Sequence, residues 1–433
     1  MRLTKILLKL MLILIPLGRV LNIELFESAA KVVPFSPNDA LLTLLVLCYV
    51  VRRFYEKRKP FEGIVYGRMI ALFPLWACIS LLVNMRYYHL AFTDIAFSSL
   101  YLIRWCEYAS LYFIVTDVLK SGTSVKSILW WLMGGALAFS AFGILQSIFL
   151  PDFAFILYPN ARPVIDYDPQ GHRLVSTILD PNIAAGYILI FALIALSFVL
   201  HRRRYWWGIF LFLFTALALT LSRGGLLGFV LGFFILAIPR SVSRKRVLGV
   251  LLVLVVLAMI LYPFLQTQIE ELQRVSIDDA SAMTRVQDWL LAWNIIRENL
   301  IFGIGFNTFG FISPQYGANR EGATAFGLAG DPMVIVALSG VIGLAIYGYV
   351  VWKVLASLHA VRRSYSEWDR AFASGVRAAT VAVLVSSLFT TLILYPQIMA
   401  VLWVLWALGT SYEAQKVQPV PVFLTNGPQT APA

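Results

Sequence analysis

The sequence predicts an all-α polytopic membrane protein with about twelve transmembrane helices. Three observations predict this class. Of the 433 residues, 60% are hydrophobic and only 13% are charged, and the mean hydropathy is +0.78. Soluble globular chains carry about 25% charged residues, so that class is excluded. Apolar runs of roughly 20 residues, the length that a helix needs to cross the hydrocarbon, also recur along the chain.

The apolar runs give the expected helices in order. The first run follows a basic start, as the apolar part of a secretory signal peptide does. Because no small-x-small cleavage motif ends it, we expect the chain to keep this helix. The runs lie near residues 5–22, 38–51, 63–83, 95–118, 127–150, 176–200, 205–221, 224–239, 247–266, 332–356, 372–393 and 397–412.

Basic residues gather in alternate loops, which predicts the orientation. Cytoplasmic loops are enriched in Lys and Arg, and twelve spans place all the basic loops and both termini on that side. This topology accounts for the net charge of +12, so no nucleic-acid partner is expected. The loops are RRFYEKRK (52–59), KSGTSVK (120–126), HRRR (201–204), RSVSRKR (240–246) and HAVRRS (359–364).

We expect one transmembrane domain over residues 1–412. A tail over residues 413–433, rich in Pro, Thr and Gln, is expected to be cytoplasmic and disordered. Two segments lie on the opposite side: residues 151–175, and a large, partly helical loop over 267–331 between the ninth and tenth helices. Chemistry on exported molecules would occur there.

Several function classes lose support. The three cysteines, Cys48, Cys78 and Cys106, lie in or beside apolar spans and predict no disulfide framework. The sequence has no Walker loop, no dinucleotide-binding fingerprint and no Cys or His pair with zinc spacing. Neither a metal nor an organic cofactor is therefore expected.

More arginines lie on the non-cytoplasmic side than the orientation rule predicts. Three of them, Arg274, Arg297 and Arg320, lie beside glutamates in the long loop, which favours solvated ion pairs. The full set is Arg86, Arg162, Arg173, Arg223, Arg274, Arg285, Arg297 and Arg320.

Arg223 lies in LTLSRGGLLG (219–228), at the turn between two apolar runs. Ser222 precedes it and Gly224-Gly225 follow, so the chain can turn sharply there and approach a ligand closely. A charge at the membrane interface is a functional candidate, although a guanidinium can also reach water as an anchor. We favour function, because an arginine beside glycines suits a phosphate. Ser222 is expected to line the substrate pocket together with Asn182.

Two further segments carry candidates. Arg173 begins RLVSTILDPN, where Asn182 either contacts a substrate or caps the next helix. Arg285 begins a segment in which Trp289 and Trp293 are typical of a helix lying at the membrane interface. The GIG of residues 303–305 predicts a loop and not a nucleotide site.

Five short motifs occur in a fixed order. They are R-x-x-E-Y (Arg104, Glu107, Tyr108), R-x-x-S-T-x-x-D-P-N, L-T-x-S-R-G, T-R-x-x-x-W with G-x-G-x-x-x-F, and G-x-x-G (Gly340, Gly343). Over roughly residues 100–350 the chain thereby resembles the O-antigen ligase and O-antigen polymerase superfamily.

The resemblance implies an inverting, metal-independent glycosyltransferase of the bacterial inner membrane with a periplasmic active site. The donor would be an undecaprenyl-diphosphate-linked glycan. The acceptor would be lipid A-core in a ligase or another lipid-linked glycan in a polymerase, and a chain-length regulator is a possible partner. The two arginines that grip the donor diphosphate in this family match Arg223 and Arg285. Arg173 and Arg104 are further candidates for this anion, or for structural ion pairs with Glu107.

One departure concerns the base. Ligases of this family carry a His-Asn pair where this chain has Asp331-Pro332, which favours a polymerase or another lipid-linked glycan transferase. Asp331 is either the general base or the N-cap of its helix, with His172 as the alternative base. A flippase for the same carrier is the alternative function, but it predicts charges spread through both halves of the chain and short outer loops.

Overall fold

A computed structural model describes residues 2–17, 20, 23–28, 31–59, 61–157, 173–239, 242–275, 280–317, 328, 330–361 and 365–417. These residues are helical apart from one antiparallel hairpin, β1 (Ile23–Ser28) paired with β2 (Lys31–Phe35). The all-α class therefore needs one correction. The hairpin forms where charged residues interrupt short runs of aliphatic and aromatic side chains, a pattern that suits strands.

A helix lies in each of the expected apolar spans. Five are long and apolar enough to cross a membrane, by length and composition: α3, α5, α7, α13 and residues Arg244–Pro263 of α10. Crossing by the others stays a prediction. The helices are α1 (Arg2–Leu14), α2 (Pro37–Tyr55), α3 (Gly67–Tyr87), α4 (Phe92–Lys120), α5 (Val125–Phe149), α7 (Pro181–Leu200), α8 (Trp206–Leu219), α9 (Arg223–Ala237), α10 (Arg244–Val275), α13 (Asp331–His359), α14 (Glu367–Ser386) and α15 (Pro396–Val417).

Several boundaries differ from the expected ones, including the ends of α1, α14 and α15. Helix α1 ends at Leu14 in a short 3-10 turn, and the side chain of Asn38 binds the carbonyl of Ile15 there (2.9 Å). Helix α14 ends at Ser386, because residues 387–395 form a separate turn. Helix α15 runs to Val417, so the expected tail begins later; Glu413 of this helix accepts a hydrogen bond from Tyr66 (2.6 Å). Residues 418–433 lie outside the described residues.

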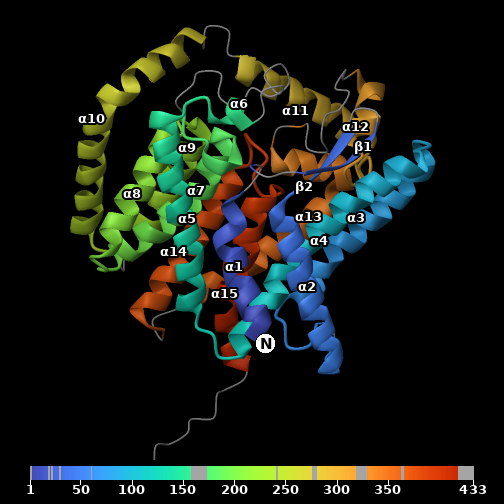
Figure 1. The fold of residues 1–433 in the computed structure, drawn as a ribbon, viewed down its shortest axis with the longest axis horizontal. Coiled ribbons are helices and arrows are strands. Elements are labelled where there is room, and N and C mark those ends of the chain that lie inside the picture. The colour runs from blue at the N-terminus through green and yellow to red at the C-terminus, as the bar shows by residue number, and fades with distance from the viewer. Residues whose placement is uncertain are drawn as a thin grey trace, which may run out of the picture.

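The helices run between two ends of the molecule (Figure 1). The short helices α6 (Phe153–Leu157) and α12 (Phe309–Ile312) lie at one end together with the hairpin and the longer helix α11 (Ala280–Glu298). The N-terminus lies at the other end, together with the described residues of the basic loops. We call these the α11 end and the basic end. This arrangement agrees with the alternation of basic loops along the chain.

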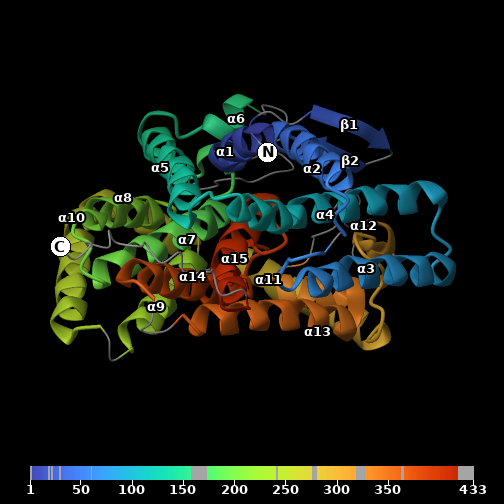
Figure 2. The same cartoon turned by 90° about the horizontal axis from the view of Figure 1, so that it is seen from below.

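Helix α7 forms the core. Its residues are apolar on every side, and a helix of this kind is stable only when it is buried all round. Its whole apolar window is buried, with α8, α9 and α14 packed against it. Viewed along the other axis, α15 lies in the middle of the molecule (Figure 2) and contacts α4, α13 and α14.

Helix α10 lies at one edge (Figure 1), and only 6% of its apolar window is buried. Exposed aliphatic side chains such as Leu252, Val255 and Met259 line it. Exposed apolar surface of this extent is costly in water and favourable in hydrocarbon. The helix is therefore suited to a lipid environment.

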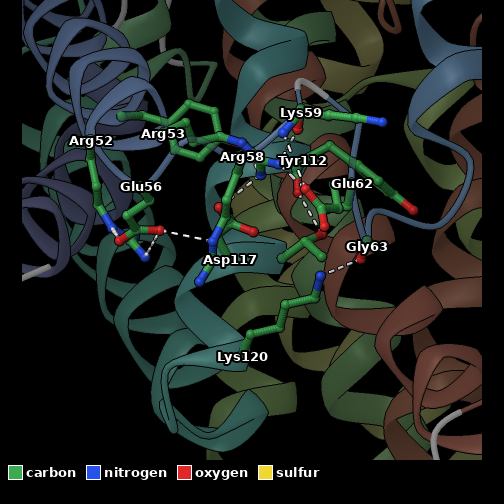
Figure 3. A network of polar contacts seen from close by, with 12 residues as sticks. Arg52, Arg53, Glu56, Arg58, Lys59, Glu62, Gly63, Tyr112, Asp117 and Lys120 are labelled. Atoms are coloured by element: carbon green, nitrogen blue, oxygen red, sulfur yellow. Dashed lines mark hydrogen bonds and ion pairs between the residues drawn. The ribbon is translucent and has the colours of Figure 1, made fainter.

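A network of polar contacts organises the basic end (Figure 3). Arg53 of α2 forms a buried ion pair with Asp117 of α4 (2.9 Å) and donates to the carbonyl of Lys59 (2.6 Å). Lys120 reaches the carbonyl of Gly63. These contacts attach the loop between α2 and α3 to the end of α4. A charge removed from water needs such a partner, so the pair is structural.

Candidate active site

Residues 386–389, which are the last residue of α14 and the turn that follows it, connect several elements at the α11 end. Ser386 donates a hydrogen bond to the carbonyl of Gly224 at the start of α9 (2.9 Å). The backbone N–H of Asp331, at the start of α13, donates to the carbonyl of Ser387 (2.8 Å). The ring of Phe389 contacts Trp289 of α11, with 6.4 Å between ring centroids. One short turn therefore touches three elements that carry predicted site residues.

Arg223 is the first residue of α9 and is exposed. Ser222 caps this helix by accepting the N–H of Gly225 (3.3 Å), and its hydroxyl donates to the side chain of Asn182 in α7 (2.9 Å). Asn182 does not cap α7, because Asp180 accepts the N–H groups of residues 182 and 183. Ser222 and Asn182 therefore fix the start of α9 on α7 and hold Arg223 at its place.

The glycines after Arg223 differ in the space around their Cα atoms. A Cβ on Gly225 would lie 2.7 Å from the Cβ of Ala185, and one on Gly232 would overlap Leu193. Both glycines therefore let α9 approach α7 closely, as small residues do between packed membrane helices. Gly224 has open space around its Cα. Only Gly224 fits the predicted role of leaving room beside the arginine.

Arg173 is buried and joins the same region. Its Nε donates to the carbonyl of Thr220 (2.9 Å), three residues before Arg223, and the N–H of Leu174 donates to the carbonyl of Leu219 (3.0 Å). These bonds occupy carbonyl groups at the end of α8 that the helix itself leaves without a partner. The side chain thus has a structural task beside the candidate anion site.

Arg285 lies on α11 and is partly buried. It shares a helix face with Trp289, Ala292 and Ile296, since their spacings are four, three and four residues. Ala292 and Ile296 are buried, and α11 packs on α13. This face is therefore turned toward the other helices. Trp293, expected with Trp289 on one face at the interface, is 58% exposed.

Asp331 is fully buried, and its carboxylate binds the turn between α14 and α15. It accepts the N–H groups of Leu392 (2.7 Å), Ile393 (2.7 Å) and Leu394 (3.2 Å). The N-cap position of α13 is occupied by Gly330 instead. The expected N-cap role is therefore wrong, and an acceptor hydroxyl cannot reach a carboxylate with no exposed surface. The geometry does not support a general base here.

Helix α13 is broken at Gly340, and a loop fills the break. The loop, residues 299–306, is called the inserted loop. Gly340 has φ 70° and ψ −179°, a conformation essentially restricted to glycine. The break frees the carbonyl of Ala337 to accept the N–H of Ile304 (2.8 Å), and the N–H of Val341 donates to the carbonyl of Leu300 (2.9 Å).

Helix α3 covers the other side of the inserted loop. Ser80 donates to the carbonyl of Phe302 (2.6 Å), Asn84 donates to that of Gly303 (2.9 Å), and Trp76 stacks on the ring of Phe302. Irregular backbone inside an apolar bundle is tolerated only when its polar groups are paired in this way. The two glycine motifs of the sequence, around residues 303–305 and 340–343, thus form one docking contact.

Three polar side chains fix the start of the inserted loop. Tyr88 donates to the side-chain oxygen of Asn299 (2.8 Å), whose amide donates to the hydroxyl of Tyr316 (2.9 Å). Burial and the hydrogen bond with Tyr88 raise the pKa of Tyr316 above its ordinary value. The hydroxyl therefore stays neutral. The C-terminal end of α11 is anchored by this cluster.

Two predicted site residues are not brought to this region by the described contacts. Arg104 of α4 forms an ion pair with Asp39 of α2 (2.5 Å), which also accepts the hydroxyl of Tyr108 (3.1 Å). Its expected partner Glu107 accepts a hydrogen bond from Thr43 (2.9 Å). Arg104 therefore has a structural ion pair, with a partner other than the predicted one. His172 lies outside the described residues.

Comparison with known proteins shows a similarity over about a third of the chain. Residues 208–348 match the family model described as O-antigen ligase. This matched segment is called the O-antigen ligase domain, after the family to which it is similar. The resemblance stated from the motifs is thereby confirmed, and this domain implies a membrane enzyme of glycosyl transfer. No curated protein matches the chain.

The O-antigen ligase domain includes Arg223, Arg285, the inserted loop and the break in α13. Sequence reasoning missed the turn at residues 386–389 and the loop-binding role of Asp331. A signal for the turn is present in Ser386-Ser387, which interrupts the expected span over 372–393. Among the described residues, no group of three His, Cys, Asp or Glu side chains is arranged to hold a metal ion.

Proposed function

We propose that this protein transfers a glycan from a polyprenyl-diphosphate carrier to an acceptor hydroxyl, on the side of the membrane at which the α11 end lies. The observation that carries the proposal is the placement of Arg223 and Arg285. Both lie in the O-antigen ligase domain, and the turn at residues 386–389 contacts the start of α9 and the Arg285 face of α11.

The chemistry suits these side chains. The leaving diphosphate carries delocalised negative charge, and a guanidinium binds phosphate oxygens with two parallel hydrogen bonds while remaining protonated. Arg223 also lies at the N-terminus of a 15-residue helix, where the helix dipole favours an anion. Together these groups would stabilise the departing diphosphate without a metal ion.

The acceptor hydroxyl must be activated for attack, either by a general base or by its position in the site. Because the carboxylate of Asp331 accepts hydrogen bonds from backbone N–H groups, we propose His172, which is next to Arg173 in the sequence, as the base. We propose a polymerase or related lipid-linked glycan transferase, because the His-Asn pair of the ligases is absent from the sequence. The inner membrane, with both termini in the cytoplasm, is the proposed location.

The test uses purified protein in liposomes with a polyprenyl-diphosphate oligosaccharide. Arg223→Ala and Arg285→Ala should each lower transfer by about 100-fold or more, as the loss of one charge-stabilising donor does elsewhere. Arg86→Ala is the matched control, since Arg86 is exposed in the last turn of α3 and lies outside the O-antigen ligase domain. Transfer within a few-fold of wild type in both site variants would refute the proposal.

Product analysis separates the alternatives. A ladder of products without lipid A-core indicates a polymerase, and a single conjugate that requires lipid A-core indicates a ligase. Translocation of the carrier without any transfer is the result expected of a flippase. Activity should persist in the presence of a chelator, and His172→Gln should reduce it.

A further inference from the structure

An apolar groove of about 490 Å³ lies between α3 and α13, on the basic-end side of Gly340. Its lining is almost entirely apolar, and Leu72, Val341 and Tyr349 are each at least 40% exposed. The lining includes Met69 and Leu72 of α3, and Val341, Ile342, Ala345 and Tyr349 of α13.

A basic side chain extends each wall of the groove toward the basic end. Arg68 precedes Leu72 by four residues on α3, and Lys353 follows Tyr349 by four residues on α13. Residues four apart share a helix face, so both charges continue the lining faces. The ammonium of Lys353 lies 5.5 Å from the ring centroid of Tyr349, and Arg68 is exposed.

The two charges also lie at the same level. Helices α3 and α13 are antiparallel neighbours: Trp76 binds the carbonyl of Ser339 (2.7 Å), and Phe73 contacts Tyr347 with 5.3 Å between ring centroids. Closer to the basic end, Tyr66 bonds to Ser357 (2.9 Å). Position 68 of α3 therefore lies opposite the turn of α13 that carries Lys353.

We propose that this groove binds an anionic phospholipid of the leaflet at the basic end. One acyl chain would lie along the apolar walls, and the headgroup phosphate would lie between Arg68 and Lys353. The argument is charge complementarity: hydrocarbon matches the walls, and an anion matches the two cations at one end. Basic pockets between transmembrane helices on the cytoplasmic side bind anionic headgroups in this manner.

The bound lipid would lie against the part of α13 that begins at the break. Val341 lines the groove, and its N–H donates to Leu300 of the inserted loop (2.9 Å). Occupation of the groove would thus stabilise the docking contact. The site is independent of the proposed glycan transfer, because neither arginine of the proposed donor site contributes to it.

The test titrates the full chain in detergent with dioleoylphosphatidylglycerol or dioleoylphosphatidylcholine and counts bound lipids by native mass spectrometry. The anionic lipid should bind more tightly. Each basic side chain near a membrane surface strengthens binding about fivefold, so Arg68→Gln with Lys353→Gln should weaken it about 25-fold. Ala345→Phe should fill the groove and weaken binding while keeping both charges.

The matched control is Arg204→Gln with Lys245→Gln, which removes the same charge from two other basic loops. Equal affinity for the two lipids, or equal losses in the groove and control variants, would overturn the proposal. Release of the bound phosphatidylglycerol by inorganic phosphate at equal concentration would also overturn the proposal, because inorganic phosphate has no hydrocarbon to occupy the groove. If native mass spectrometry shows dimers of the wild-type chain, and Ala345→Phe converts them to monomers, then a second copy of the chain covers the groove instead of a lipid. No glycan donor is present, so failure here leaves the proposed function untouched.

Discussion

The docking of the inserted loop into α13 gives a sharp prediction at Gly340. In Gly340→Ala, the new Cβ would overlap the carbonyl oxygen of Ile301, and residue 340 would keep a backbone conformation open essentially to glycine alone. The strain costs about 1 to 3 kcal/mol. If the loop leaves instead, the Ile304–Ala337 and Val341–Leu300 hydrogen bonds are lost, at about 1 to 2 kcal/mol each. We expect a loss of stability of about 3 kcal/mol.

The assay compares Gly340→Ala with Gly348→Ala by thermal unfolding in detergent and by glycan transfer. Gly348 lies on the same helix with open space around its Cα. Alanine there should preserve or raise stability, because glycine is the weaker helix former. Gly340→Ala should lower Tm by several degrees and also lower transfer, since the loop continues from the helix that carries Arg285. Equal Tm values for the two variants would refute the docking argument.

Two further predictions concern buried carboxylates. Asp331→Ala should lower the free energy of unfolding by at least about 3 kcal/mol, because three backbone N–H groups lose a charged acceptor; Asp331→Asn should lower it less, and denaturant unfolding measures both. Unchanged stability in Asp331→Ala would contradict the loop-binding role. Asp39→Ala should cost about 3 kcal/mol, the lower end of the range for buried pairs, because the partly buried Arg104 loses this carboxylate; Asp39→Ala with Arg104→Leu should recover most of the loss. Thermal unfolding of the single and double variants checks this, and additive losses would speak against the pair.

The sequence alone determined the membrane class, the order of the helices and the elements that carry the candidate arginines. These features are local. A run of about 20 apolar residues is a helix candidate whatever surrounds it, and a basic loop marks its side through its own composition. The short motifs were likewise contiguous in the chain, and the family match over residues 208–348 confirmed what they indicated.

The tertiary structure alone decided what each polar side chain does. Arg104 binds Asp39 from 65 residues away, Ser222 binds Asn182 from 40 away, and Asp331 binds Leu392 from 61 away. No local pattern encodes such partners, because each depends on which helices pack together. The break in α13 could not be predicted from the sequence for the same reason. Apolar residues continue through Gly340, and the irregular backbone there is favourable only because the inserted loop pairs its polar groups.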